Sequence, residues 1–425
     1  MSKSLQELTD HLLDCVRLVQ ENLAGSADAA TDPSALFADL LDSMGMVEFL
    51  SVLARDCGVG PETIEQTVDR RFGTVGELAE RLLAAGLIPR PSGDVASSPA
   101  DAGIREPQRT GCWLAATAAR LPDAVEPAAA LNAALDRAPG WLETHAGIHQ
   151  RRVWGERDPL DSAAAAGREV IERGGLPAEE IGALLVTSEA PPLLAGLAAA
   201  LHHRLGLHPE TAALEVGGAC TGFLAAVWLA QALLDRVGAA LIIAVEAPSR
   251  LLRVEPGPAG EAAALFGDGA AAALLCARPP GGEAVPLGGV ALGSNGSAAH
   301  LLRVERAASG AIAVHMEGGP LAVRAVRVMA QSVRDLAARH GLTVADLRGV
   351  VAHGGNGRMP ALLARQLGLA PERVWSTTTD TGNLGSASLP FAWAVHRSQP
   401  PGPVAWAAVG AGLTWAAAMS GSAEN

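Results

Sequence analysis

The sequence predicts an α/β protein with a small helical domain at its N-terminal end, and three observations lead to this prediction. From about residue 107 onward, apolar runs of strand length alternate with long Ala- and Leu-rich helical segments, as is typical of α/β layering. Within this part, Arg173–Thr187 (RGGLPAEEIGALLVT) resembles Arg339–His353 (RHGLTVADLRGVVAH), about 166 residues later, which indicates a duplicated fold. Residues 1–88, by contrast, have only helical periodicity.

The N-terminal region is acidic and is predicted to be all-helical. Its apolar residues recur at helical spacing in three segments separated by polar or Gly- and Pro-bearing turns: Leu5–Leu23, Asp42–Cys57 and Val75–Ala85. Through Arg90 the region has 15 acidic and 7 basic side chains, so it carries −8 of the net charge of −13. The following stretch, Pro89–Gln108, is rich in Pro, Ser, Gly and Asp, a composition that predicts a flexible linker.

Composition and charge exclude several classes of function. A net charge of −13 argues against binding to the phosphate backbone of a nucleic acid. The five cysteines are scattered without a CxxC pair, so neither a structural metal site nor a disulfide framework is predicted. The chain has no Tyr, and Lys3 is its only Lys, which removes Schiff-base, P-loop-lysine and Tyr-acid chemistry. Acid–base work therefore falls to His, Asp, Glu or Cys.

The predicted location is the cytoplasm. The N-terminal residues MSKSLQELTDHLLD lack the charged-then-apolar pattern of a signal peptide. No apolar run of the sequence approaches the roughly 18 residues that a spanning helix needs. We therefore expect neither a membrane span nor a nucleic-acid partner.

The α/β part is organised around Leu214–Asp235 (LEVGGACTGFLAAVWLAQALLD). It begins as a short strand, tightens through small residues and places Cys220 where a helix begins. Unpaired backbone N–H groups and the positive end of the helix dipole favour a thiolate there, so Cys220 is a candidate nucleophile. The alternative is a buried cysteine that packs as a small hydrophobic residue.

In the helical region, Ser43 opens a predicted helix directly after Asp42. Such a serine can be a simple N-cap. However, the motif Asp-Ser-Met followed by Val47 and Glu48, in an acidic helical unit of this length, resembles an acyl carrier protein. The segment Thr74–Leu78 is similar to the last helix of that four-helix family. The resemblance implies that Ser43 carries covalent 4′-phosphopantetheine, added by a phosphopantetheinyl transferase; Met44 departs from the family's usual Leu.

The α/β part resembles β-ketoacyl-acyl carrier protein synthase III and its thiolase-fold relatives. The resemblance rests on five motifs in family order: GACTGF around Cys220, FGDGAAAALL at Phe266–Leu275, VAHGGNGRM around His353, TGNLGSASLP around Asn383 and VGAGLTW at Val409–Trp415. It implies a five-layered αβαβα thiolase-like fold with duplicated βαβαβαββ halves. The resulting domains are a carrier at 1–88, a linker at 89–106 and a synthase at 107–421, with halves at about 107–282 and 283–421.

The same resemblance implies a mechanism and a set of site residues. Cys220 accepts an acyl group from a thioester, and the N–H groups of Cys220 and Gly412 form the oxyanion hole. His353 and Asn383 donate hydrogen bonds to the carbonyl of a malonyl thioester, whose enolate forms with loss of carbon dioxide and attacks acyl-Cys220. The family's basic docking position corresponds to Arg358, and a homodimer is expected.

Of three departures from the family pattern, two concern substrate binding. Trp141 stands at the family's coenzyme A-stacking position, but His145 replaces the neighbouring Arg, which favours delivery from a carrier. Gly354 and Gly355 replace Gln-Ala after His353, near the positions implied to contact the pantetheine arm, which include Asn356.

Glu189, in LLVTSEAPP, occupies a position that is usually Thr. It resembles the acid–base Glu of 3-hydroxy-3-methylglutaryl-CoA synthases, where a carboxylate permits proton abstraction without decarboxylation. The alternative is a glutamate on a surface loop.

The predicted function is therefore that of an acyl-thioester condensing enzyme with an attached carrier, in a specialised fatty acyl or polyketide pathway. Three alternatives remain open. One is transfer of the acyl group from Cys220 to an oxygen or nitrogen nucleophile, against which Asn383 argues. Another is condensation without decarboxylation, using Glu189. The third is a non-catalytic scaffold that binds partners, against which Cys220, His353 and Asn383 argue together.

Overall fold

The computed structural model describes residues 112–421 apart from 194, 282–283, 307–311, 317 and 397–401, together with single residues and short runs between 5 and 87. The chain forms two compact units. One contains Met1–Gly103 and Gly318–Arg324, and the other contains Ile104–Glu317 and Ala325–Asn425. The predicted carrier serine, Ser43, and the predicted linker at 89–106 lie outside the described residues.

In the N-terminal unit, helix α5 (Val75–Ala84) is described along its whole length. Thr74 begins it with a capping box, in which the Thr74 side chain accepts from the Glu77 N–H and the Glu77 carboxylate accepts from the Thr74 N–H. Every described residue at 5–16 and at 46–57 is also helical, in agreement with the predicted helices. Their apolar side chains are buried together with those of α5, among them Leu12, Phe49, Leu53, Leu78 and Leu82.

The second unit is built on two half-sheets with the same strand order. In the first, β5 (Ala212–Glu215), β4 (Ile181–Thr187), β6 (Ala239–Glu246), β7 (Gly269–Cys276) and β1 (Cys112–Arg120) follow one another. In the second, the order is β13 (Val374–Trp375), β12 (Gly349–Ala352), β14 (Val404–Gly410), β15 (Thr414–Ser420) and β9 (Ala291–Ser294). Strand β8 (Val285–Leu287) pairs with β1 and β15 and so joins the two halves.

The pairing directions also repeat, which confirms the duplicated fold. Strand β4 is parallel to β5 and β6, as β12 is to β13 and β14. The last strands are antiparallel in both halves. The two similar sequence segments occupy equivalent places. Arg173–Thr187 ends α8 (Pro159–Gly174) and forms β4, while Arg339–His353 ends α12 (Gly318–Arg339) and forms β12.

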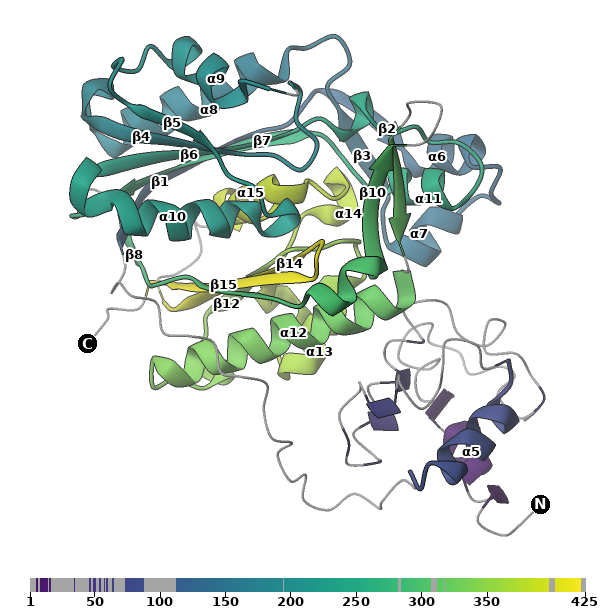
Figure 1. Cartoon of the computed structure of the whole chain (residues 1–425). Helices are drawn as coiled ribbons and strands as arrows, with labels where there is room; N and C mark the ends of the chain where they lie inside the picture. The colour runs from purple at the N-terminus through teal and green to yellow at the C-terminus, as the bar shows by residue number, and fades with distance from the viewer. Residues whose placement is uncertain are drawn as a thin grey trace. The chain divides into compact units, whose positions relative to one another are not determined.

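Helices separate and cover the half-sheets, which gives the predicted five layers (Figure 1). Helices α10 (Gly222–Val237) and α15 (Ser388–His396) lie between the two half-sheets. They share one buried cluster with strands of both halves, for example Phe223 with Trp406. Helices α8 and α9 (Leu197–Leu205) cover the outer face of the first half, and α12 and α13 (Met359–Leu367) lie along the second.

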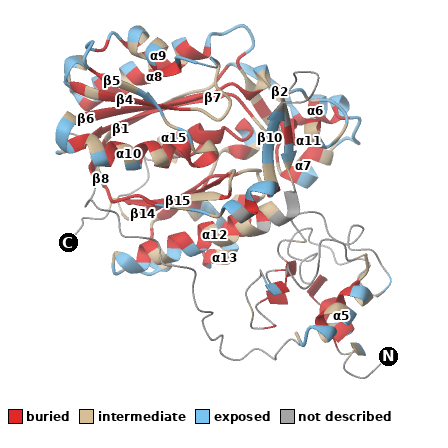
Figure 2. Cartoon of the chain, in the orientation of Figure 1, coloured by how far each residue is buried: buried red, intermediate tan, exposed pale blue. Residues whose placement is uncertain are grey.

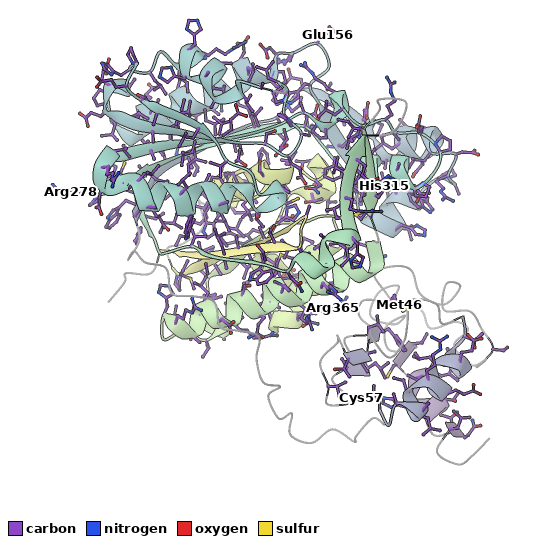
Figure 3. All side chains as sticks on the ribbon, in the orientation of Figure 1. Met46, Cys57, Glu156, Arg278, His315 and Arg365 are labelled. Carbon is purple, nitrogen blue, oxygen red and sulfur yellow. The ribbon has the colours of Figure 1, made fainter. Side chains whose placement is uncertain are left out.

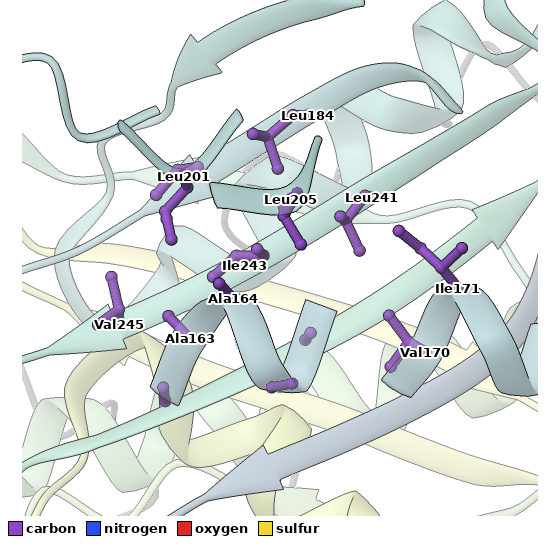
Figure 4. Packing of buried hydrophobic residues seen from close by; sticks show 14 of the residues in the cluster. Ala163, Ala164, Val170, Ile171, Leu184, Leu201, Leu205, Leu241, Ile243 and Val245 are labelled. Atoms are coloured by element: carbon purple, nitrogen blue, oxygen red, sulfur yellow. The ribbon is translucent and has the colours of Figure 1, made fainter. Parts of the chain in front are cut away.

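The core explains why the strands form where they do. All eight residues of β6 and all eight of β7 are buried, as expected for strands covered on both faces (Figure 2). On the outer face, Val170 and Ile171 of α8 and Leu201 of α9 pack with Leu241 and Ile243 of β6 (Figure 4). Charged side chains such as those of Glu156 and Arg278 lie at the surface (Figure 3).

Additional elements surround the layers near the C-terminal ends of the parallel strands. They are α6 (Ala128–Ala134), α7 (Trp141–Ala146), α11 (Pro258–Ala264), α14 (Thr378–Thr381) and the hairpins β2–β3 (Ala124–Pro127 with Gln150–Val153) and β10–β11 (Leu302–Arg306 with Ile312–Met316).

Among the described residues, the helical segment Ala219–Val237 is long and apolar enough to cross a membrane by length and composition, whereas no apolar run of that length was expected from the sequence. More than half of its apolar window is buried inside the protein, as in the core helix of a globular domain.

Candidate active site

The turn that presents Cys220 is backbone-strained. Residues Ala219–Thr221 form a single 3₁₀ turn directly before α10, so Cys220 lies at a helix start, as predicted. Gly218 has a φ of 137°, and Ala219 has a φ of 50°, one of two positive values among the described non-glycine residues. The Thr221 hydroxyl donates to the Gly218 carbonyl at 2.6 Å and closes the turn. Positive φ at an alanine is the kind of strain that concentrates at functional sites.

Two glycines let neighbouring elements approach this turn closely. A Cβ at Gly222 would lie 2.1 Å from the hydroxyl of Thr187, the last residue of β4. A Cβ at Gly410, at the end of β14, would lie 3.2 Å from the Cys220 backbone nitrogen. The nucleophile turn is therefore held between strands of both halves.

The Cys220 thiol is buried against polar groups. Its Sγ lies 3.1 Å and 3.4 Å from the two carboxylate oxygens of Glu189. The uncharged side chain of Asn383 favours the thiolate and so acts to lower the pKa of Cys220. Burial, followed by the charges of Glu189 and Glu246, nevertheless raises the pKa of Cys220 well above its ordinary value. The expectation of a thiolate stabilised by the helix start is therefore wrong for the free protein, because desolvation and nearby carboxylates outweigh the helix dipole.

Glu189 lies half-buried in the bend after β4 with its carboxylate on the Cys220 thiol, which corrects the interpretation of a glutamate that merely faces solvent on a surface loop. It follows β4 by two residues, and its carboxylate points at the Cys220 thiol. Burial and the neighbouring charge of Glu246 raise the pKa of Glu189 to about 7. A carboxylate with this pKa exchanges protons near neutral pH, the range in which a general acid or base works best.

Glu246, the last residue of β6, is a member of the site that sequence reasoning missed. Its carboxylate accepts hydrogen bonds from the backbone N–H groups of Glu189, Ala190 and Ser386 and from the hydroxyl of Ser386. Burial raises the pKa of Glu246, but these donors favour its ionised form, so the proton shared by the two carboxylates is on Glu189. A lone acidic residue at the end of the apolar run LIIAVE was the available signal.

The Gly385–Ala387 turn follows Asn383 and lies against the two carboxylates. The Asn383 side-chain oxygen accepts from the Gly385 N–H at 2.9 Å, which leaves its amide N–H₂ to donate. Gly385 has a φ of 50°, and a Cβ there would lie 2.7 Å from Glu189 and 2.9 Å from Glu246. Only a glycine therefore leaves room for both carboxylates at this point.

His353 follows β12 directly and is buried. Its backbone N–H donates to the Ala407 carbonyl of β14, the strand that ends at Gly410 beside Cys220. Burial lowers the pKa of His353 to about 4, so the imidazole is neutral at physiological pH. Its Nδ1 has no hydrogen-bond partner in the described part of the chain. A neutral, buried imidazole with a free nitrogen can bind a polar atom of a substrate.

Trp141 begins α7 and is covered by its own neighbours. The His145 ring stacks on it with centroids 4.8 Å apart, and His145 Nδ1 lies 2.9 Å from the Trp141 carbonyl oxygen. The Arg137 guanidinium lies 5.1 Å from the Trp141 ring centroid and pairs with Glu261.

The other predicted binding residues have structural contacts of their own. The Asn356 side chain accepts from the N–H groups of Arg358 and Met359 and caps α13. The Arg358 guanidinium donates to the Thr144 carbonyl of α7. Gly412 has a φ of 122° and packs against Thr414, while the glycine found close to the Cys220 nitrogen is Gly410. The oxyanion role of Gly412 stays a prediction.

No group of three or more His, Cys, Asp or Glu side chains suited to a metal ion occurs among the described residues. The side chains that meet at Cys220 are suited instead to nucleophilic and acid–base chemistry on a thioester.

Comparison with known families agrees with this chemistry. The model of the family described as 3-oxoacyl-[acyl-carrier-protein (ACP)] synthase III matches residues 214–296, and the model of its C-terminal part matches residues 337–421. These segments contain Cys220, Glu246, His353 and Asn383.

Similar proteins cover most of this unit. The chain is 30% identical over 311 residues to a β-ketoacyl-[acyl-carrier-protein] synthase III of Dinoroseobacter shibae, with 69% of this chain and 94% of that protein covered. It is 33% identical over 331 residues to a 3-oxopimeloyl-[acyl-carrier-protein] synthase of Rhodothermus marinus, covering 74% and 94%. Among solved structures, the priming β-ketosynthase of the R1128 polyketide pathway is 26% identical with a TM-score of 0.65, covering 75% and 98%.

Proposed function

The chain belongs to the β-ketoacyl-[acyl-carrier-protein] synthase III family and is an acyl-thioester condensing enzyme; from this premise we propose how it condenses its substrates. Cys220 accepts an acyl group from a thioester. A malonyl thioester then loses carbon dioxide, and its enolate carbon attacks acyl-Cys220 to give a β-ketoacyl-carrier.

The observation that carries this proposal is the orientation of the Asn383 amide, whose oxygen is held by the Gly385 N–H while the side chain favours the Cys220 thiolate. An amide N–H₂ whose oxygen is already bound to Gly385 can donate to a developing enolate oxygen while it stays neutral. His353 complements it, since a neutral imidazole with an unpartnered nitrogen can bind the same thioester carbonyl. The two donors thus stabilise the negative charge that forms when carbon dioxide leaves.

A second candidate is condensation without decarboxylation, and the contact between Glu189 and Cys220 favours it. With a pKa of about 7, Glu189 can remove an α-proton from a second acyl thioester. A malonyl carboxylate would be repelled here by the half-buried Glu189 and the buried Glu246, whereas an uncharged acyl group would not be repelled. The two candidates therefore differ in whether carbon dioxide is released.

We test the two with carboxyl-labelled malonyl-carrier and the full chain. Asn383→Asp should reduce carbon dioxide release by about 10²-fold or more, the scale of losing an oxyanion donor, while Cys220 still takes up the acyl group. The control Gln331→Glu makes the same amide-to-acid change at an exposed position of α12. A condensation product without labelled carbon dioxide would favour the Glu189 route. An ester or amide product would instead indicate acyl transfer to oxygen or nitrogen.

The N-terminal unit is proposed to be the carrier of this enzyme, with 4′-phosphopantetheine on Ser43. The proposal is supported by the Asp-Ser-Met motif, the acidic composition and the helical conformation of the described residues. It implies a phosphopantetheinyl transferase as a partner. Delivery by the carrier is favoured over free coenzyme A because Trp141 is already stacked on His145, and Asn356 and Arg358 are proposed to line the path of the arm. A homodimer in a specialised fatty acyl or polyketide pathway completes the proposal.

A further inference from the structure

Cys220 lies in surroundings that oppose its ionisation, so loading of an acyl group needs a proton acceptor. The thiol is buried, and the two charged groups that act on it are the carboxylates of Glu189 and Glu246. The polar group that favours its thiolate, Asn383, is uncharged. A thiol is a weak nucleophile until its proton is removed.

We propose that Glu189 is the general base that takes the Cys220 thiol proton during acyl loading, and that Glu246 is the residue that positions it. This inference rests on the proposed acylation of Cys220. The geometry that carries it is direct: the Glu189 oxygens are 3.1 Å and 3.4 Å from Sγ, within the reach required of a general base.

The proton balance of the step is complete within the site. As Sγ attacks the thioester carbonyl, its proton passes to Glu189 and a carbon–sulfur bond forms. When the tetrahedral intermediate collapses, the original carbon–sulfur bond breaks. Glu189 then returns the proton to the departing thiolate, which leaves as a thiol. Glu189 ends the half-reaction as a carboxylate, and no other reactant is needed.

The hydrogen bonds of the Glu246 carboxylate explain why Glu189, and not Glu246, is available as the base. The Glu246 carboxylate is occupied by four donors, which include the backbone N–H of Glu189. It therefore fixes the segment after β4 and keeps its own negative charge close to Glu189. Gly385 leaves the space in which the two carboxylates lie side by side. The adjacent charge makes Glu189 a stronger base than an exposed glutamate.

Few titratable groups contribute to the pH dependence of this step. They are Cys220 from the turn before α10, Glu189 after β4 and Glu246 from β6. The 385–387 turn contributes the uncharged Ser386 hydroxyl. His353, which follows β12, is neutral above about pH 4. The rate of loading should therefore rise with pH and level off above about pH 7, as Glu189 ionises.

The experiment compares the full-length wild type with Glu189→Gln in a single turnover. Acetyl-, isobutyryl- and octanoyl-coenzyme A serve as probes, and mass spectrometry of the Cys220 peptide follows loading. We expect Glu189→Gln to load at least about 10²-fold more slowly at pH 7 and to lose the rise in rate centred near pH 7. Glu179→Gln, which removes an exposed carboxylate just before β4, should behave as the wild type.

A second readout separates catalysis from structure. Thiolate absorbance at 240 nm, with Cys220→Ser as the blank, should appear at lower pH in Glu189→Gln than in the wild type, because a repelling charge is gone. Glu189→Asp, which keeps a carboxylate, should retain the pH dependence at a reduced rate. A Glu189→Gln enzyme that ionises more easily and loads as fast as the wild type overturns the inference alone. If the wild type loads an acyl group on Cys220 neither from these probes nor from an acyl-phosphopantetheine arm on its own carrier, the proposed function fails with it.

Discussion

At the scale of single residues, the site depends on a balance between burial and charge at Cys220. The start of α10 favours a thiolate, yet burial and two carboxylates keep the proton on sulfur. The same two carboxylates oppose each other, and the donors around Glu246 decide which of them holds a proton. Such an arrangement is costly for the folded state, as is common for functional sites.

This cost has a measurable pH dependence. The pKa of Glu189 is about 7 in the folded protein against 4.5 for an ordinary glutamate, so between these values the folded state binds more protons than the unfolded state. The contribution of Glu189 to the free energy of unfolding therefore falls as pH rises from 4.5 to 7. Above pH 7 this contribution does not fall further. Because Gln does not titrate, Glu189→Gln should gain stability relative to the wild type by about 1–3 kcal/mol between these limits.

Urea unfolding of both proteins at pH 4.5 and pH 8 measures this difference. The direction of the stability change identifies its cause, since a carboxylate stabilised by an ion pair would make the wild type gain stability with rising pH. A stability difference that does not change between the two pH values would show that Glu189 has an ordinary pKa in the folded protein.

At the scale of elements, the site lies where the ends of several strands meet the start of one helix. Strands β4, β6 and β14 end at Thr187, Glu246 and Gly410, and α10 begins two residues after Cys220. The carboxyl ends of parallel strands are the usual binding edge of α/β sheets. Here the contact of α10 with β4 is so close that Gly222 has no room for a side chain.

Gly222→Ala should therefore destabilise the protein and displace the nucleophile turn. Gly222 has an ordinary helical φ of −54°, so crowding against Thr187 and Ser386 is the cause of the expected loss. Overpacking of this kind costs about 1–3 kcal/mol. Urea unfolding measures the loss, and loading of Cys220 should also slow.

The matched control for this variant is Gly296→Ala. Nothing lies within 4 Å of a Cβ at Gly296, and this glycine also lacks a left-handed φ. Its substitution should change stability by less than about 0.5 kcal/mol. Equal losses for the two alanines would mean that the packing of α10 on β4 is looser than described.

At the scale of the whole molecule, the proposed carrier and the condensing unit share one chain. The linker predicted from composition has about 20 residues, and a flexible chain of that length spans roughly 25 Å on average. Such a tether holds a substrate near millimolar effective concentration. The acidic charge of residues 1–90 should add attraction to basic surface on the condensing unit, and this attraction is screened by salt.

We therefore expect the intact chain to outperform a severed pair. A protease site placed in the linker allows the same preparation, loaded with phosphopantetheine, to be compared before and after cleavage at low protein concentration. The cleaved form should be much slower, and added salt should slow it further. Ser43→Ala should take up no phosphopantetheine and lose the advantage. Identical rates before and after cleavage would contradict the tether while leaving the role of Cys220 intact.

Most of the fold follows from local sequence pattern. The alternation of apolar strands and helices, and the likeness of 173–187 to 339–353, predicted the layers and the duplication that the strand order confirms. Cys220, His353 and Asn383 could be named because each lies in a short motif at an element boundary. Such motifs can be recognised in the sequence because turns, strands and helix starts depend on neighbouring residues.

The electrostatics of the site could not be predicted in the same way. By itself, the sequence determined the layers, the repeat and the position of Cys220 at a helix start. Only the tertiary structure decided that Glu189 reaches Cys220, that Glu246 holds it there and that the thiol keeps its proton. In sequence, Glu189 is 31 positions from Cys220 and 57 positions from Glu246. Their pKa values depend on burial and on distances between atoms, which exist only once strands and helices from separate parts of the chain have packed together.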